Sequence, residues 1–314
     1  MKICQVHPGC GIPVPPPAWG AVEKIVWEFT CNLRELGYEV DIKYAAEIQP
    51  GEYDMVMVHV ANLALYLAER GIPYVFQHHD HHAYHYGKDS HVYKENREAM
   101  LHSVFSLVPA RYLVDYFDLS NVYYFSHGAD VNKFYPNESY PINHSLLMLA
   151  NNGLGGYGAY DRKGFGLGVQ VAMSRNLPIT IAGPKNNENW LNDNPWVKGY
   201  PKLDIIWEPS NEQLRQLYTS HTIFLHPSDL EAGHPNLTLL EAAACGLPIL
   251  GWIETETTFH GLWRAPRDLN EMLRGLDTII NEYDEYRQRS LNTAHELSWF
   301  NRSKELIKLY NNHI

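Results

Sequence analysis

The chain has 314 residues, of which 45% are hydrophobic and 19% are charged, a composition typical of a globular protein with two domains or one very large one. Its formal net charge of −11 argues against a basic platform for nucleic acid or anionic membranes. No run of 18 apolar residues occurs, so we expect no membrane-spanning helix. The four scattered cysteines predict free thiols in a reducing cytoplasm, where we expect the protein to be located.

Short β-rich apolar runs alternate with helical patterns along the whole chain. The start, MKICQVHPGC, predicts a first strand and no signal peptide. Helices are predicted at 21–36, 164–175, 210–220 and 237–245, and the chain after Trp252 is expected to be mainly helical. Strands are predicted at 2–7, 39–45, 54–60, 73–79, 103–109, 121–126, 145–151, 178–183, 203–209, 222–227 and 248–252.

This alternation predicts an α/β fold in which two parallel sheets are each doubly wound with helices. The second half restarts the pattern of the first. The polar, proline-bearing segment 137–144 predicts the boundary, which gives an N-terminal domain of residues 1–143 and a second domain from residue 144.

A glycine-rich loop, LANNGLGGYGAYDRKG (149–164), contains the spacing G-x-G-x-x-G. A dinucleotide site of the NAD type also needs a carboxylate about 20 residues further on. None occurs between Asp161 and Glu188, so the NAD hypothesis lacks its second requirement and rests on the glycine spacing alone, which is weak evidence. What remains is a loop followed by Arg162 and Lys163 at a helix start, where cations oppose the helix dipole. A bound diphosphate would reverse that penalty, and the alternative is a solvated surface pair.

A second stretch, HPSDLEAGHPNLTLLEAAACGLPIL (226–250), predicts a helix with Asn236 as N-cap and Gly246 as C-cap. Glu241 is the one charged residue of that helix, and its neighbours three and four positions away are Leu, Thr, Ala and Cys. We therefore expect a buried carboxylate that needs partners. Ribose hydroxyls satisfy this need, and so does an internal lysine or arginine.

These residues resemble a known family. The stretch 227–249 is similar to the signature of GT-B-fold, retaining glycosyltransferases of the family 4 type. Residues 14–40 resemble that family's first loop and helix, 127–136 its segment before the interdomain linker, and 297–312 its closing helix. The resemblance implies a GT-B fold with two Rossmann-like domains facing a cleft. The nucleotide-sugar domain then spans 144–296, and the helix 297–314 returns to the acceptor-binding domain.

Carried over residue by residue, the resemblance implies that Glu241 binds the donor ribose and Lys163 the diphosphate. It places Glu231 near the transferred sugar and the backbone of Gly20 near the diphosphate. His79, at a strand end, is expected to face the reacting sugar, so His79 and Glu231 are the expected catalytic residues. The other residues expected at the donor are Arg162, His234, Asn236 and Leu237.

Two features depart from the family pattern. Glu231 and Glu241 are separated by nine residues where the family usually has seven. The family's phosphate-binding arginine is replaced by Asn151 or Asn152, and we hypothesise that Arg162 supplies its charge from the other side of the loop.

The resemblance implies an enzyme, a hexosyl- or pentosyltransferase, that moves a sugar from a nucleotide sugar, by default a UDP-sugar, to an acceptor hydroxyl with retention of configuration. The nucleotide sugar is a co-substrate, and we expect neither a cofactor nor an essential metal. The acceptor is a glycan, a small molecule or a modified base in DNA, although the charge disfavours nucleic acid. The alternatives are a GT-B epimerase or phosphorylase and an inactive sugar-nucleotide binding module.

The stretch HHDHHAYH (78–85) carries six groups that can ligate a metal. Neighbours in one loop seldom converge on one ion, so we expect an acceptor-side loop with one functional histidine. A metal site stays the alternative.

Overall fold

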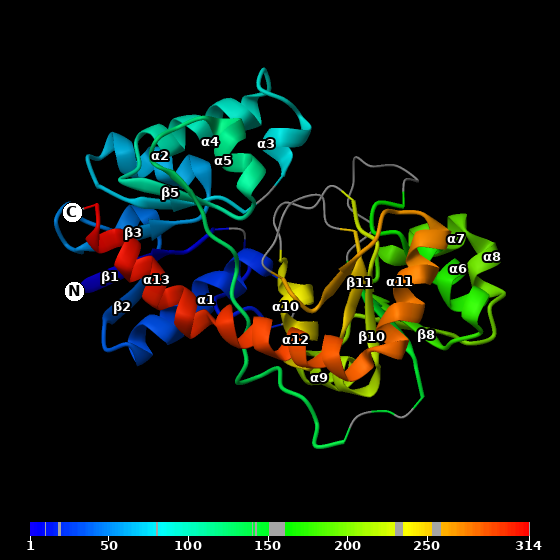
Figure 1. The fold of residues 1–314 in the computed structure, drawn as a ribbon. Coiled ribbons are helices and arrows are strands. Elements are labelled where there is room, and N and C mark those ends of the chain that lie inside the picture. The colour runs from blue at the N-terminus through cyan, green and yellow to red at the C-terminus, as the bar shows by residue number, and fades with distance from the viewer. Residues whose placement is uncertain are drawn as a thin grey trace. The chain divides into compact units, whose positions relative to one another are not determined.

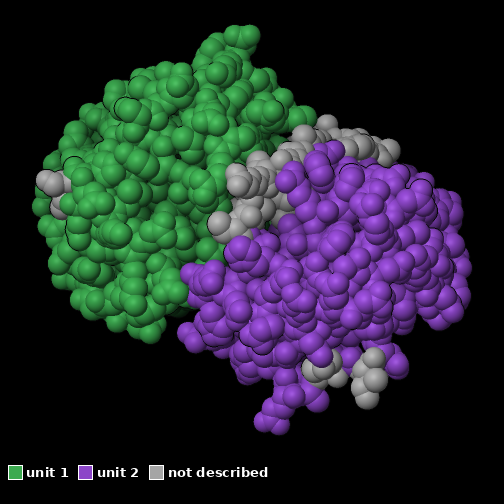
Figure 2. Space-filling model, in the orientation of Figure 1, with its two compact units in different colours: residues 1–128, 231–236, 297–314 green, residues 129–230, 237–296 purple. Residues whose placement is uncertain are grey.

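The computed structural model describes residues 1–9, 11–17, 20–79, 81–139, 141, 143–150, 161–229, 235–252 and 259–313. The chain forms two compact units, shown in green and purple in Figure 2. The first unit contains residues 1–128, 231–236 and 297–314, and the second contains residues 129–230 and 237–296. Residues 129–143, which the sequence analysis assigns to the first domain, thus group with the second unit.

The first unit is built on a six-stranded parallel sheet with the order β2-β1-β3-β4-β5-β6. Each of its six strands coincides with a predicted run. The strands are β1 (Lys2–Val6), β2 (Glu39–Lys43), β3 (Met55–Val58), β4 (Val75–Gln77), β5 (Phe105–Val108) and β6 (Val122–Tyr124). The helices of this unit are α1 (Ala21–Glu35), the 3₁₀ helix η1 (Ala45–Glu47), α2 (Ala61–Glu69), α3 (His82–His85), α4 (His91–Leu101), α5 (Arg111–Phe117) and α13 (Trp299–Asn311).

Helix α1 forms because its apolar residues recur at helical spacing and are covered on one face. Ile25, Phe29 and Leu33 are buried, which confirms the predicted period. In Figure 1, α13, coloured red, runs beside α1, and the Trp299 ring meets the Phe29 ring edge to face at 5.0 Å between centroids. The last helix therefore completes the core of the first unit, as expected from the family resemblance.

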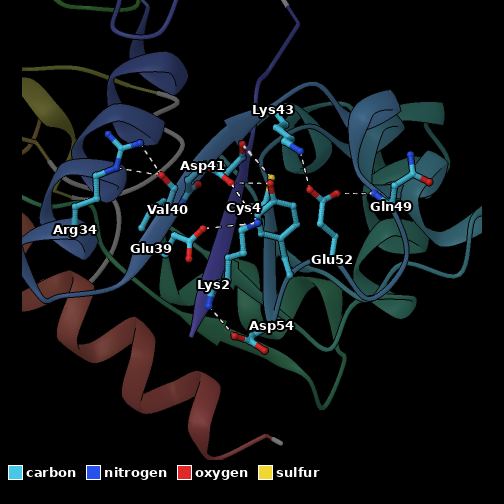
Figure 3. A network of polar contacts seen from close by, with 12 residues as sticks. Lys2, Cys4, Arg34, Glu39, Val40, Asp41, Lys43, Gln49, Glu52 and Asp54 are labelled. Atoms are coloured by element: carbon cyan, nitrogen blue, oxygen red, sulfur yellow. Dashed lines mark hydrogen bonds and ion pairs between the residues drawn. The ribbon is translucent and has the colours of Figure 1, made fainter.

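Polar side chains join the edge strand β2 to its surroundings (Figure 3). Arg34 of α1 donates to the carbonyl of Val40 at 2.6 Å, and the Lys43 ammonium pairs with the Glu52 carboxylate at 2.7 Å. This ion pair raises the pKa of Lys43 and lowers that of Glu52. The network fixes the strand at the edge of the sheet, where a free edge would otherwise invite pairing with another chain.

The second unit contains a second six-stranded parallel sheet, with the order β12-β11-β10-β7-β8-β9. Five of its strands were predicted, whereas β12 was not. The strands are β7 (Leu146–Leu149), β8 (Ile179–Gly183), β9 (Leu203–Trp207), β10 (Ile223–His226), β11 (Ile249–Gly251) and β12 (Leu262–Arg264). The helices are α6 (Phe165–Arg175), α7 (Asn187–Asp193), α8 (Pro195–Lys198), α9 (Asn211–Ser220), α10 (Leu237–Ala244), α11 (Leu269–Asn281) and α12 (Tyr283–Glu296).

Each strand order contains a point where the winding of the sheet reverses. In the second unit the neighbours β7 and β10 flank this point, which is the Rossmann arrangement. In the first unit the neighbours β1 and β3 flank it, as in flavodoxin-like sheets. Ligands of open parallel sheets bind outside the carboxyl ends of the strands at such points. The two strand orders therefore predict where the functional residues of each unit lie.

None of the helices in the described ranges has both the length and the apolar content needed to cross a lipid bilayer.

Candidate functional site

In the second unit, the segment before α6 lies against the loop that follows β10. The backbone N–H of Asp229 donates to the carbonyl of Arg162 at 2.9 Å. Gly164 has a φ of +70°, and a Cβ there would lie 2.5 Å from the Pro227 carbonyl oxygen. Only glycine permits this close approach. The segment is thereby fixed beside β10, one of the two strands at the reversal point.

Arg162 and Lys163 are buried in this segment, with 4% and 9% of their surface exposed. The alternative of a solvated surface pair is therefore wrong. A guanidinium and an ammonium group at a reversal point can both bind an anionic ligand. Their position makes this corner a candidate site for an anion.

A carboxylate of the protein lies at the amino end of α6. The Asp161 carboxylate accepts from the backbone N–H of Phe165 at 3.0 Å and from that of Gly166 at 2.7 Å. These are amides that a phosphate at this helix end would use. The protein's own carboxylate therefore satisfies these two amides. The side chains of Arg162 and Lys163 beside them stay the predicted ligands of a diphosphate.

Arg267, three residues after β12, joins two segments of this corner. Its guanidinium donates to the Asp161 carbonyl at 2.7 Å and to the Asp229 carboxylate at 3.2 Å. Arg267 is not among the expected site residues, because the sequence pattern does not predict β12. A prediction of β12 would have placed Arg267 just beyond the carboxyl end of a strand, which is where ligand-binding residues of parallel sheets are expected.

Glu241 of α10 is buried, with 6% of its surface exposed, as predicted. Its Oε2 accepts from the phenol of Tyr218 on α9 at 2.9 Å. Burial, and then the nearby carboxylate, hold the pKa of Tyr218 well above its usual value, so the phenol keeps its proton and donates it. The partners expected from the sequence are ribose hydroxyls or an internal cation, and a tyrosine is not among them.

Two of the other residues expected at the donor lie at the start of α10, and the predicted C-cap glycine lies at its end. Gly246 has a φ of +82°, and its N–H donates to the Ala243 carbonyl at 2.9 Å, which confirms the predicted C-cap. Asn236 directly precedes the helix, and Leu237 is its first residue. Glu231 and His234 lie outside the described residues.

In the first unit, Gly20 directly precedes α1, with a φ of +142°. A Cβ at this position would lie 2.9 Å from the Glu23 carboxylate and 3.1 Å from Pro16 Cβ. Both the backbone conformation and the space require glycine here. The role of its backbone toward a diphosphate stays a prediction.

His79 lies just beyond the carboxyl end of β4 and belongs to a cluster of imidazole rings. Its Nε2 is 2.9 Å from Nδ1 of His59, which directly follows β3. The rings of His59 and His79 stack at 5.2 Å, and the rings of His79 and His127 stack at 5.8 Å. Burial, and then neighbouring histidines, hold the pKa of His79 well below its usual value, so the ring is neutral near pH 7.

His78, the neighbour of His79, has different surroundings. Its side chain is buried, and its Nδ1 lies 2.9 Å from the Asn96 amide oxygen on α4. The two adjacent histidines therefore have separate environments, one beside α4 and one beside His59. Among the described residues, no group of three or more His, Cys, Asp or Glu side chains is arranged to hold a metal ion, and Asp80 lies outside them.

A comparison with protein-family models gives no match, and a comparison with curated protein sequences gives none either. Solved structures do match over the whole chain. Sucrose-phosphate synthase from Thermosynechococcus elongatus has a TM-score of 0.75 at 13% identity, covering 99% of this chain and 98% of its own. Anabaena HepE in complex with UDP-glucose has a TM-score of 0.73 at 12% identity, covering 99% and 100%. Starch synthase IV from Arabidopsis thaliana, bound to ADP and acarbose, has a TM-score of 0.69 at 10% identity, covering 99% of each chain.

The fold is GT-B. The GT-B fold accounts for two Rossmann-like units and for a last helix that belongs to the first of them. Within this GT-B chain, Gly20 and His79 belong to the first unit. Arg162, Lys163 and Glu241 belong to the second.

Proposed function

We propose that the chain is a glycosyltransferase that moves a sugar, hexose or pentose, from a nucleoside diphosphate sugar to an acceptor hydroxyl with retention of configuration. The observation that supports this most is the buried pair Arg162 and Lys163 beside β10, at the reversal point of a Rossmann-ordered sheet. A diphosphate carries the charge that such a pair attracts. HepE, a structural neighbour, was solved with UDP-glucose, which makes a UDP-sugar the first donor to test.

Glu241 is proposed to bind the donor ribose. A carboxylate offers about four acceptor positions, and the Tyr218 phenol uses one of them. Ribose hydroxyls are donors of the kind that a buried carboxylate accepts. The phenol orients the carboxylate before the nucleotide arrives, which lowers the entropy cost of binding.

The chemical step is proposed to depend on charge stabilisation. When the bond between the sugar and the diphosphate breaks, negative charge grows on the leaving group. Lys163 and Arg162 are proposed to stabilise this charge. We assign no protein base, and we propose that the leaving phosphate accepts the proton of the acceptor hydroxyl. His79 and Glu231 are proposed to contact the reacting sugar.

Isothermal titration with UDP, ADP and GDP sugars, followed by transfer assays with the best ligand, tests the proposal. Lys163→Met should weaken donor binding at least about tenfold, the effect of losing one charge-assisted contact of roughly 1.4 kcal/mol or more. The matched control is Lys198→Met, because Lys198 is an exposed lysine of the same unit that contacts Asn192. Equal affinities of the two variants would contradict the assignment of the diphosphate to this corner.

Two further outcomes address the alternatives. Incubation with the donor alone should leave it unchanged, whereas an epimerised nucleotide sugar or a sugar phosphate would indicate an epimerase or a phosphorylase. Multiple turnovers with any acceptor would exclude an inactive binding module. The same assays, run with glycans, small molecules and DNA containing modified bases, identify the acceptor.

A further inference from the structure

A line of hydrogen bonds crosses the carboxyl edge of the first sheet and ends at His79. The Gln5 amide nitrogen on β1 donates to the Met57 sulfur on β3 at 3.4 Å. The Gln5 amide oxygen lies 2.9 Å from Nε2 of His59, and Nδ1 of His59 lies 2.9 Å from Nε2 of His79. Strands β1 and β3 flank the reversal point of this sheet, so the line lies where a ligand site is expected.

The chemistry of Met57 fixes the direction of these bonds. A thioether sulfur has no hydrogen to donate, so it faces the NH₂ group of Gln5. The amide oxygen of Gln5 therefore faces His59, and an amide oxygen only accepts. Nε2 of His59 consequently carries a proton and donates it to Gln5.

Because His59 is neutral, the direction of its bond to Gln5 also determines the direction of its bond to His79. Burial lowers the pKa of His59 to about 3, so the ring has one proton near pH 7 and Nδ1 is an acceptor. Nε2 of His79 must then be the donor in the bond between the two rings. Because His79 is neutral as well, its Nδ1 is left with a lone pair.

Nδ1 of His79 is buried, and the described part of the chain provides no hydrogen-bond partner for it. A buried acceptor without a donor is unfavourable and rare in folded proteins. Such an atom at the carboxyl edge of a parallel sheet indicates that the missing donor comes from a ligand.

We infer that Gln5 and His59 are positioning residues that hold His79 in the Nε2–H tautomer, so that its Nδ1 accepts a hydrogen bond from a ligand hydroxyl. The identification of this ligand as a sugar rests on the proposed function. An unprotonated imidazole nitrogen accepts a hydrogen bond from a hydroxyl, and its lone pair repels a carboxylate. The inferred substrate class is therefore a donor sugar that presents a hydroxyl, and no uronic carboxylate, to His79.

The tautomer is measured directly by two-bond ¹H–¹⁵N NMR on the full chain with ¹⁵N-labelled histidine, with His59→Gln and His79→Gln used to assign the signals. We expect the rings of His59 and His79 to carry a proton on Nε2 and none on Nδ1. Gln5→Leu removes the acceptor for His59, so His79 should then populate both tautomers. The matched control is Gln77→Leu, because Gln77 is an equally buried strand glutamine that lies outside this line. A His79 proton on Nδ1 in the wild type overturns the inference whether or not the variants fold.

Kinetics separates positioning from a general structural effect. Gln5→Leu should raise the KM of the donor about tenfold, whereas Gln77→Leu should leave it unchanged. Donor analogues that each lack one hydroxyl should identify the hydroxyl that contacts His79. Removing that hydroxyl should clearly weaken binding to the wild type, but should weaken binding to Gln5→Leu only slightly, because the variant has already lost this contact. Equal losses in both proteins at every position overturn the inference.

The two proposals fail in distinguishable ways. If no nucleotide sugar binds the wild type, the proposed function is wrong, and the NMR result still decides the tautomer. If the enzyme turns over but His79 carries its proton on Nδ1, the transferase assignment holds and the inference about Gln5 and His59 is wrong.

Discussion

Replacing Tyr218 with phenylalanine removes a single hydroxyl and keeps the ring. Tyr218 is fully buried, so the phenylalanine ring retains its packing, and the loss is confined to the bond to Glu241. A hydrogen bond to a charged group contributes about 1.5–3 kcal/mol, against about 0.5–1.5 kcal/mol for a neutral one. For a unit of this size that cost corresponds to a fall of about 3–12 °C in Tm.

Tyr200→Phe is the matched control. Tyr200 is buried in the same unit, and its phenol donates to backbone carbonyls, at 2.7 Å to Leu177 and 3.2 Å to Ala172. Its acceptors are neutral, so Tyr200→Phe should cost about half as much. Thermal and urea unfolding of both variants provide the comparison. The chain has two units, which can unfold in separate transitions. The Tm values are therefore compared for the one transition that Tyr218→Phe shifts.

A double-mutant cycle tests whether the charge of Glu241 is the cause. In a Glu241→Gln background the acceptor is neutral, so adding Tyr218→Phe should cost only about 0.5–1.5 kcal/mol. If Tyr218→Phe costs the same in both backgrounds, or no more than Tyr200→Phe, then the carboxylate is not stabilised as described.

Three more predictions follow from the geometry. Gly164→Ala should lower Tm clearly more than Gly71→Ala, because both glycines have a left-handed φ (+70° and +67°) but only a Cβ at 164 meets backbone; equal shifts in a thermal scan would refute the close approach. Arg267→Met should weaken donor binding about tenfold by titration calorimetry by releasing two segments of the donor corner, whereas Arg175→Met, at an exposed ion pair, should not. The folded-state pKa of His127 is lowered to about 4 by burial, so the unfolded chain binds more protons below pH 6.5; His127 should contribute about 3 kcal/mol to the stability lost from pH 6.5 to 4, beside the contributions of His59 and His79, and His127→Gln should reduce the loss by that amount in urea unfolding.

The fold was largely predictable because its elements depend on local patterns. The apolar period of α1 and the β-rich runs of the first eleven strands are visible in the sequence, and Gly246 ends its helix as expected. Strand β12 was missed because it has three residues, none of them fully buried, so it shows no distinct apolar run. Short edge strands form through pairing with a neighbour, which a local pattern does not report.

The site was predictable in its residue types but not in its partners. The burial of Glu241 follows from its apolar neighbours along α10, whereas its partner Tyr218 is 23 positions away on another helix. The line from Gln5 to His79 joins three strands through pairs separated by 54 and 20 positions. Such bonds depend on the strand order of the sheet, and one sequence without its fold does not supply that order.

The return of α13 to the first unit has a consequence for synthesis of the protein. Tyr310 of α13 hydrogen-bonds to the Asp54 carbonyl, 256 positions earlier. A Cβ on Gly128 would lie 2.5 Å from the Trp299 ring, so the tryptophan packs closely on the backbone at Gly128. The amino-terminal part of the first unit therefore leaves the ribosome without the Trp299 ring against Phe29, and gains this core layer only after α13 has been synthesised. During that interval the apolar surface that α13 later covers is exposed, which is the condition under which nascent chains aggregate.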